Sequence, residues 1–445
     1  MRRFAVLLTS ALVVAGLAPA RADLPALPLD PNIVAAMAQV QPAQLRATDE
    51  RLVAFGTRST FSENQGPKRG YTAARDYVAA RFREIARRSG GRMTVAFDEY
   101  VQKADGKRVP RDVLISSVVA TLRGDDPSRA FVMSSHLDSR NSNNDDGIKD
   151  APGADDNGSA VSAVLEAARI LAPLPMHATV IFACYDSEEQ GLFGSGHHAK
   201  TLKDAGVDVQ GDINNDIIGA SVGDDGVKRD DQVRIFSESL PPGTPLSRIN
   251  VQGGENDSPS RELARFARET GDAYPAGLKG MLVFRADRFL RGGDHESFNA
   301  QGFAAIRYVE PVETFSHQHQ DVRVENGVQY GDLLQFMDFD YLAKVTRYNI
   351  ATVATLALAP AAPPAIVETK ELTNSTTLTW KPVARAVRYE VVRRLTTAPL
   401  WTDVTDAGNV TALTLPFSKD QWIFGVRSVD AEGHRSVASF PVPVR

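Results

Sequence analysis

The feature that most constrains this chain is a set of five short clusters of His, Asp and Glu, each placed where an apolar run ends. In chain order they are SSHLDS (His136, Asp138), PGADDNGSA (Asp155, Asp156), YDSEEQGLFGS (Glu188, Glu189), NNDIIG (Asp216) and FSHQHQD (His317, His319). Side chains at the ends of neighbouring strands meet at one edge of a sheet. Carboxylates that converge there repel one another unless a cation lies between them. The pattern therefore predicts a metal centre at a sheet edge.

The segments between the clusters alternate between strand-like and helical patterns. The expected strands are 95–101, 113–122, 131–135, 177–185, 207–214, 278–285 and 304–308, and the expected helices are 31–55, 71–88, 159–171, 191–202, 258–270 and 333–358. This alternation predicts an α/β fold with a mostly parallel sheet covered by helices on both faces. Residues 224–257 are charged and rich in turn formers. We expect them to be an insertion outside the core.

The chain divides into at least two domains. Its 445 residues are too many for one ordinary core. The proline-rich segment APAAPP, residues 359–364, is a stiff boundary that cannot continue a helix. We therefore expect one large domain over 23–358, joined by this linker to a second domain. Residues 365–445 contain short alternating strands that predict a small β-sandwich, and with Trp380 on an early strand and Tyr389 on the next they resemble a fibronectin type III module.

The first 22 residues have the pattern of a secretory signal peptide: Arg2 and Arg3, an apolar run over 4–18, and Ala-Arg-Ala at 20–22. We therefore expect export to the periplasm or the medium. No later segment has the length and apolarity of a membrane span. The net charge of −5 and the lack of a basic stripe argue against nucleic acid as a partner. Cys184 is the only cysteine, so an internal disulfide is excluded, and its apolar neighbours predict a buried thiol.

The first two clusters suit metal binding, although each has an ordinary structural alternative. His136 and Asp138 are two apart, so on a strand they share a face, and the Asp can accept a proton from one imidazole nitrogen while the other binds metal. The alternative is a hydrogen-bonded histidine at a strand end. Asp155 and Asp156 precede a helix and can act as an N-cap, but a carboxylate can also bridge two cations.

The pair Glu188 and Glu189 follows an apolar strand. One Glu can bind metal while the other accepts a proton from water that the cation has made more acidic. The alternative is a pair that complements a helix dipole. Two histidines with three or four carboxylates match the ligand preferences of zinc, with Mn or Co as substitutes. The chain has no cysteine cluster and no H-E-x-x-H, which argues against a structural zinc knot and a helix-borne single-zinc protease.

Taken together and in this order, HLDS, PGADDNGSA, SEEQGLFGS, a strand-end Asp and a late His before Asp resemble the two-zinc exopeptidases of clan MH over residues 136–358. That group includes bacterial leucyl aminopeptidases, aminopeptidase Y, glutamate carboxypeptidase II-like enzymes and glutaminyl cyclases. The resemblance implies two zinc ions and these roles: His136 and Asp216 bind one zinc, Glu189 and His319 bind the other, Asp156 bridges them, Glu188 is the general base and Asp138 orients His136. Asp294 and His295 in GGDHESF resemble a family segment near the substrate end of the cleft.

The last cluster departs from the family pattern. The family's final ligand often stands as H-T-x-x-D, whereas this chain has H-Q-H-Q-D. His317 has the expected spacing to Asp321, but His319 fits a variant of the motif better, and we favour His319 as the ligand.

The function implied by the resemblance is hydrolysis of the N-terminal peptide bond of peptides with a free N-terminus. Three alternatives remain open at this stage. Two keep the fold and change the reaction, to glutaminyl cyclisation or to carboxypeptidase activity. The third is a non-catalytic surface-binding protein in which the sandwich is the working part.

Overall fold

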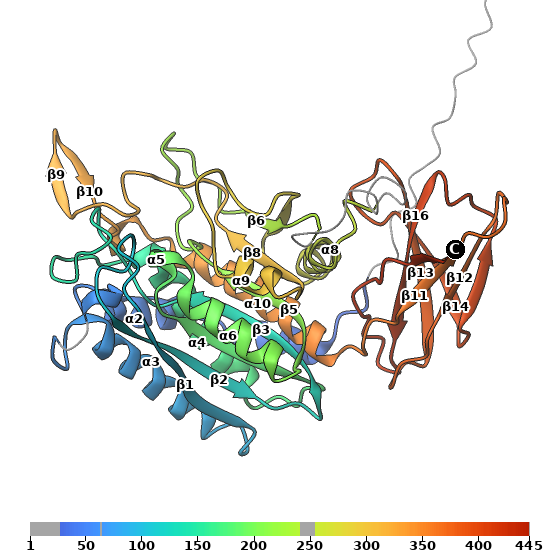
Figure 1. The fold of residues 1–445 in the computed structure, drawn as a ribbon, viewed down its shortest axis with the longest axis horizontal. Coiled ribbons are helices and arrows are strands. Elements are labelled where there is room, and N and C mark those ends of the chain that lie inside the picture. Colours follow the sequence, from blue (N-terminus) through green and yellow to red (C-terminus); the bar gives the residue numbers. More distant parts are fainter. Residues whose placement is uncertain (1–26, 63–64, 241–253, 445) are drawn as a thin grey trace, which may run out of the picture.

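A computed structural model describes residues 27–62, 65–240 and 254–444, so the expected signal peptide at 1–22 lies outside the described residues. The chain forms an eight-stranded sheet with helices on both faces, followed by two small β-sheets (Figure 1). The strands of the large sheet are β1 (Met93–Gln102), β2 (Val113–Leu122), β3 (Asp126–His136), β4 (Ala178–Tyr185), β5 (Asp208–Asn215), β6 (Gln232–Ser237), β7 (Lys279–Val283) and β8 (Ala305–Val309). Their spatial order is β1-β2-β4-β3-β5-β8-β6-β7.

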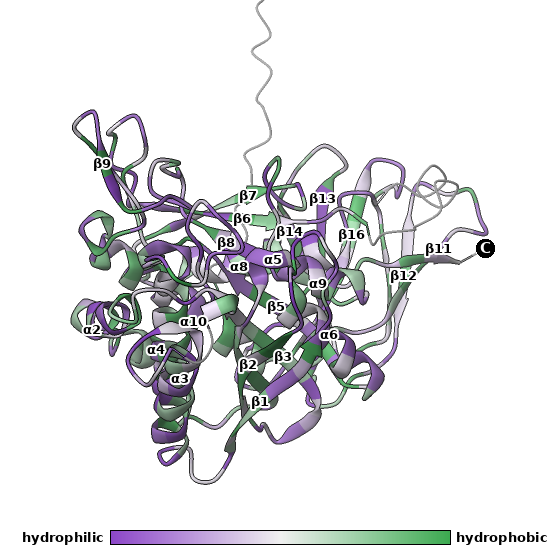
Figure 2. Ribbon diagram, turned by 60° about the vertical axis from the view of Figure 1, so that its left-hand side comes forward, coloured by the Kyte–Doolittle hydropathy of each residue, from purple (hydrophilic) through white to green (hydrophobic). Residues whose placement is uncertain are grey.

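Four neighbouring strands in the middle of this sheet, β4, β3, β5 and β8, run parallel. On one side, β2 pairs antiparallel with β4 and β1 pairs antiparallel with β2. On the other side, β6 runs antiparallel to β8 and parallel to β7. The expected α/β class is therefore confirmed, with a sheet that is mixed at its margins and parallel at its centre. Hydrophobic residues are prominent in β2 and β3 (Figure 2), and every residue of β4 is buried, as expected for strands covered on both faces.

Helices cover both faces of the sheet. They are α1 (Pro31–Met37), α2 (Pro42–Val53), α3 (Gly70–Ala86), α4 (Ala160–Leu171), α5 (Glu188–Gly191), α6 (Phe193–Asp204), α8 (Pro259–Ala273), α9 (His295–Ala300) and α10 (Phe339–Leu358). The larger core lies on the face covered by α1, α2, α3, α4, α8 and α10. A smaller core on the opposite face joins alternate residues of β3 and β4, such as Val132 and Ile181, to Ala199 of α6 and Phe298 of α9.

Two expected helices have different bounds. The helix expected over 31–55 is divided into α1 and α2, because Pro42 lacks an amide hydrogen and forces Gln41 into an extended conformation. The helix expected over 333–358 begins only at Phe339. Asp338 caps it by accepting a hydrogen bond from the amide of Tyr341.

The expectation that 224–257 lies outside the core is wrong for β6. This strand is inserted between β8 and β7, and Val233 and Ile235 are fully buried on alternate positions. The surrounding charged residues concealed this alternation in the sequence. Residues 241–253 of the segment lie outside the described part of the chain.

The C-terminal part forms two small sheets. One has the order β15-β12-β11-β17 and the other β14-β13-β16. Their strands are β11 (Ala365–Glu368), β12 (Thr376–Trp380), β13 (Arg388–Leu395), β14 (Asp403–Gly408), β15 (Ala412–Leu415), β16 (Trp422–Val429) and β17 (Val442–Val444). Trp380 and Tyr389 are buried in the core of this part, and its likeness to a fibronectin type III module stays a prediction. A short hairpin, β9 (Arg323–Glu325) and β10 (Val328–Tyr330), projects from the part that contains the large sheet (Figure 1). Within the described residues, no helix is long and apolar enough to cross a membrane.

Candidate metal centre

The site residues come from the carboxyl ends of the central parallel strands. His136 is the last residue of β3, Glu188 and Glu189 begin α5 shortly after β4, and Asp216 directly follows β5. Because these three strands are parallel neighbours, their ends share one edge of the sheet. Asp156 reaches the same edge from the turn Ala154–Ser159. This confirms the convergence that the positions of the clusters predicted.

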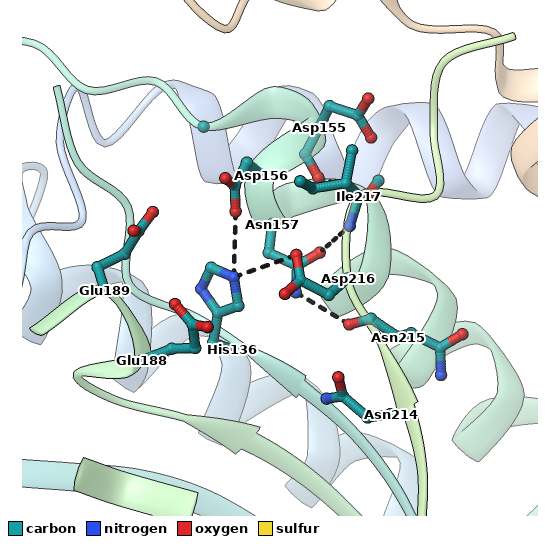
Figure 3. A network of polar contacts seen from close by, with 12 residues as sticks. His136, Asp155, Asp156, Asn157, Glu188, Glu189, Asn214, Asn215, Asp216 and Ile217 are labelled. Carbon is teal, nitrogen blue, oxygen red and sulfur yellow. Dashed lines mark hydrogen bonds and ion pairs between the residues drawn. The ribbon is translucent and has the colours of Figure 1, made fainter. Parts of the chain in front are cut away.

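The ligand-type side chains form two trios that share Asp156. In the first, His136 Nε2 lies 3.1 Å from Asp156 Oδ1 and 3.5 Å from Asp216 Oδ1 (Figure 3). In the second, His319 Nε2 lies 3.0 Å from both Asp156 Oδ2 and Glu189 Oε1. Each trio is compact enough for one metal ion. One carboxylate therefore presents one oxygen to each trio.

The late histidines have different surroundings. His319 belongs to the second trio, whereas the ring of His317 stacks on Phe336 with the centroids 3.5 Å apart. His319 has a φ of 55°, an uncommon left-handed conformation for a side-chain-bearing residue. This turn separates the directions of two histidines that the sequence places only two residues apart.

The trios fit zinc in donor type and in electrostatics. Each combines one imidazole nitrogen with carboxylate oxygens, which are zinc ligands in proteins. Among the described residues, the buried atoms Glu189 Oε1 and Asp216 Oδ1 accept no hydrogen bond, although each lies within 3.5 Å of a histidine nitrogen. Buried carboxylate oxygens are costly unless paired, and a cation in each trio would satisfy both atoms.

The charges in the cluster shift the pKa values of its members strongly. Burial raises the pKa of Asp156, but His136 and His319 outweigh it and hold that pKa well below its usual value. Burial lowers the pKa of both histidines, but the surrounding carboxylates outweigh it and raise the pKa of His319 to about 10 and that of His136 well above normal. The cluster therefore stabilises positive charge at the positions that face Asp156.

Glu188 lies beside His136 but belongs to neither trio (Figure 3). Burial raises the pKa of Glu188 well above its usual value; His136 opposes this rise, and Asp216 and Glu189 add to it. A carboxylate with a raised pKa next to a cation site can accept and release a proton during a reaction.

Comparison with known proteins agrees with this geometry. The pattern described as peptidase family M28 matches residues 117–336. A probable zinc metalloprotease of Leptosphaeria maculans is 45% identical over 93% of this chain and 97% of its own length. The chain belongs to peptidase family M28. It is a hydrolase, and its relatives are probable zinc metalloproteases.

Solved structures show the same fold at low identity. The LapA aminopeptidase of Legionella pneumophila superimposes with a TM-score of 0.51 at 17% identity, over 73% of this chain and 74% of LapA. A glutaminyl cyclase of Macrostomum lignano has a TM-score of 0.52 at 16% identity, over 74% of this chain and 94% of its own. An aminopeptidase and a glutaminyl cyclase therefore share this fold, so the fold alone does not distinguish between the two reactions.

Asp138 contacts His136 differently from the sequence expectation. His136 Nδ1 lies 3.0 Å from the main-chain oxygen of Asp138, whereas the nearest carboxylate oxygen is 3.6 Å away. The carboxylate accepts hydrogen bonds of 3.1 Å from the amides of both Glu188 and Glu189. In this M28 site, Asp138 therefore contacts His136 through its main-chain oxygen and the amides of the two glutamates through its side chain.

Several contacting residues were not identified from the sequence. Arg307 on β8 lies 2.7 Å from Asp216 Oδ2, the oxygen that points away from His136. Asn157 donates a hydrogen bond to the carbonyl of Asn215 and accepts one from the amide of Ile217, which ties the loop of Asp156 to that of Asp216 (Figure 3). Only the position of Asn157 beside Asp156 could have indicated such a role.

Asp294 and His295, which the resemblance associated with the substrate end of the cleft, belong to neither trio. Both are buried, and His295 Nε2 lies 2.9 Å from the main-chain oxygen of Ala286. Burial raises the pKa of Asp294 to about 7. Their substrate-end role stays a prediction.

Proposed function

We propose that this protein is an exported zinc-dependent aminopeptidase that removes N-terminal residues from peptides. The observation that carries the proposal is the position of Asp156, whose two oxygens face the histidines of two trios. Glu188 lies beside the first trio and belongs to neither. Membership in a peptidase family supports peptide-bond hydrolysis over a non-catalytic surface role. The signal-like pattern of residues 1–22 supports export to the periplasm or the medium.

In this proposal two zinc ions occupy the cluster. The first is held by His136 and Asp216, the second by Glu189 and His319, and Asp156 contributes to both. The support is that each trio contains a buried carboxylate oxygen that accepts no hydrogen bond, Asp216 Oδ1 in the first and Glu189 Oε1 in the second. The donor atoms also match those that zinc prefers in proteins. Mn or Co could take the same places because they accept the same donors.

Bound zinc would supply Lewis-acid activation of the scissile carbonyl and lower the pKa of nearby water. Glu188 is the proton carrier: it accepts the proton of the attacking water and delivers it to the leaving amine nitrogen. Asp138 keeps Glu188 in place through the amide hydrogen bonds. The cluster thus separates metal binding by Glu189 from proton transfer by Glu188.

The test uses the purified full-length chain, its zinc content and three substrates. We expect two zinc ions per chain, and hydrolysis of an amino-acid anilide and of a peptide blocked at its C-terminus. We expect no hydrolysis of the N-acetylated anilide. Activity should vanish with a chelator and return with zinc.

Each alternative gives a different result. A requirement for a free C-terminal carboxylate would identify a carboxypeptidase. Ammonia release from an N-terminal glutaminyl peptide, with one zinc per chain, would identify a cyclase. Failure to turn over any of these substrates with zinc bound would contradict the aminopeptidase proposal.

A further inference from the structure

Two buried charged side chains from distant parts of the chain hold the loop that carries Asp156. The first is Arg58, which is fully buried and follows α2. Its guanidinium donates hydrogen bonds to the carbonyls of Leu137, Pro152 and Gly153, at 2.8, 2.5 and 2.9 Å. Leu137 directly follows the ligand His136, so Arg58 joins the segment of one trio to the loop of the shared carboxylate.

The second is Asp332, which follows the hairpin strand β10 and is 6% exposed. Its Oδ1 accepts the amide of Asp155 at 2.9 Å, and its Oδ2 accepts the amide of Asp156 at 2.7 Å. The main-chain oxygen of Asp332 also accepts the amide of Ala154 at 3.4 Å. Three consecutive amides of the loop therefore point at one residue.

Arg58 and Asp332 thus bind complementary backbone groups of the same loop. Arg58 donates hydrogen bonds to the carbonyls of 152 and 153, and Asp332 accepts hydrogen bonds from the amides of 154–156. Gly153 between them has a φ of 56°, and a Cβ there would lie 2.8 Å from Arg58 Nη2 and 2.5 Å from the oxygen of Asp156. The backbone therefore fits only with glycine at this point, which leaves little freedom for the direction of Asp156.

We propose that Arg58 and Asp332 are positioning residues that fix the main chain at 152–156, so that the two oxygens of Asp156 face the two histidines. The proposal rests on the two-metal cluster of the proposed function. Within the described part of the chain, neither residue forms a hydrogen bond with the histidine rings or with the side-chain carboxylates of the trios, so each acts through the loop. Partners of this kind, one step removed from a metal, typically change metal affinity by about ten- to hundredfold when they are lost.

The main test is Asp332→Asn in the full-length chain. The amide keeps the size of the side chain but turns one acceptor into a donor, which then faces an amide hydrogen of the loop. We expect zinc binding, measured by competition with a chelator, to weaken about ten- to hundredfold. We also expect kcat to fall while KM changes little. The matched control is Asp212→Asn, a fully buried carboxylate on β5 that bonds to Ser134 and not to this loop.

Thermal unfolding of the metal-free proteins separates positioning from simple support of the fold. If Asp332→Asn lowers the melting temperature but binds zinc as tightly as the natural chain, the proposal is wrong. If Asp332→Asn does not fold, Arg58→Lys answers the same question, because lysine keeps the charge but cannot reach three carbonyls in a fixed plane. Wild-type zinc affinity in Arg58→Lys would likewise overturn the proposal.

The measurement also separates this inference from the proposed function. Zinc affinity is read without any substrate. A chain that binds two zinc ions but fails to cleave N-terminal residues would contradict the aminopeptidase reaction and leave the positioning roles intact. If the natural chain is an active aminopeptidase but the variants bind zinc as tightly as it does, the positioning roles are contradicted and the aminopeptidase reaction stands.

Discussion

At the scale of single residues, the adjacent glutamates Glu188 and Glu189 have different surroundings although they share one turn. Glu189 Oε1 approaches His319, whereas Glu188 lies beside His136 and outside both trios. The residue pattern alone could not separate them, because the start of a helix can direct neighbouring side chains into one cleft; only the family resemblance gave them different roles. Their surroundings in the folded chain do separate them.

Glu188→Gln should keep the bound metal and lose most of the turnover. The amide has nearly the same size but cannot accept the proton of the attacking water, and loss of a general base costs about a hundredfold to ten-thousandfold. Zinc content and kcat on an anilide substrate are the measurements, with Glu84→Gln on the exposed face of α3 as the control. Near-normal kcat in Glu188→Gln would show that another group carries the proton.

His319→Ala and His317→Ala should differ in bound zinc. His319 belongs to the second trio, so its removal should lower the zinc content from two ions toward one. His317 stacks on Phe336, so its removal should leave the zinc content unchanged and affect only local packing. Zinc analysis of both purified variants decides the matter, and the opposite pattern would make His317 the ligand.

At the scale of elements, the site depends on tight turns where the strands end. Ser187, just before Glu188, has a φ of 63°, and Ile217, just after Asp216, has a φ of 57°. Residues with a Cβ adopt this left-handed conformation at a cost of about 1–2 kcal/mol. Such strain at functional sites persists because the surrounding contacts fix the backbone.

The pair Ser187→Gly and Ser187→Ala tests this strain. Both substitutions remove the hydroxyl that bonds to Gln190, but only alanine keeps the Cβ. We expect the glycine variant to be more stable than the alanine variant by about 1 kcal/mol in urea unfolding. The exposed helical position Ala47 on α2 is the control, because glycine there should be less stable than alanine by about the same amount. The same order at both positions would argue against strain at Ser187.

At the scale of the whole molecule, the C-terminal sheets are joined to the peptidase part by buried charges next to α8. Arg394 lies 2.5 Å from Asp257, and Trp401 donates a hydrogen bond to Glu262. Arg427 is paired with Glu269 of α8. Removing the C-terminal sheets would take one partner from each of these acids and leave Asp257 and Glu262 with Arg265 of α8 alone, so these contacts link the stability of the two parts.

Arg394→Leu should destabilise the full chain by about 1.5–3 kcal/mol, because it removes the charged hydrogen bond to the buried Asp257 and leaves only Arg265, 3.5 Å away, to balance that carboxylate. The control is Arg323→Leu, which breaks a solvent-exposed pair with Glu325 and should change stability by no more than about 1 kcal/mol. Urea unfolding monitored by fluorescence gives both values. Equal effects would indicate that the contact beside α8 is as weak as a surface pair.

Much of the fold follows from short stretches of sequence. The apolar runs of β3 and β4 are recognisable by themselves, and each strand is followed by an acidic loop of the site. The sequence does not reveal β6, because two of its buried residues, Val233 and Ile235, alternate with polar ones inside a charged segment. The helix break at Pro42 is the opposite case. The proline itself signals that a helix begins there, but the apolar spacing over 31–55 suggests one continuous helix.

What the sequence by itself determined is the chemistry of the cluster: which strand ends carry imidazoles and carboxylates, and in what order. Those features are local, since they depend on a strand and the few residues after it. Only the tertiary structure decided how Asp156 is aimed, which late histidine faces it, and that Arg58, Asp332 and Arg307 support the site. These contacts join residues as far apart as Asp155 and Asp332, 177 positions along the chain, and no local pattern encodes which distant charge will reach a given loop.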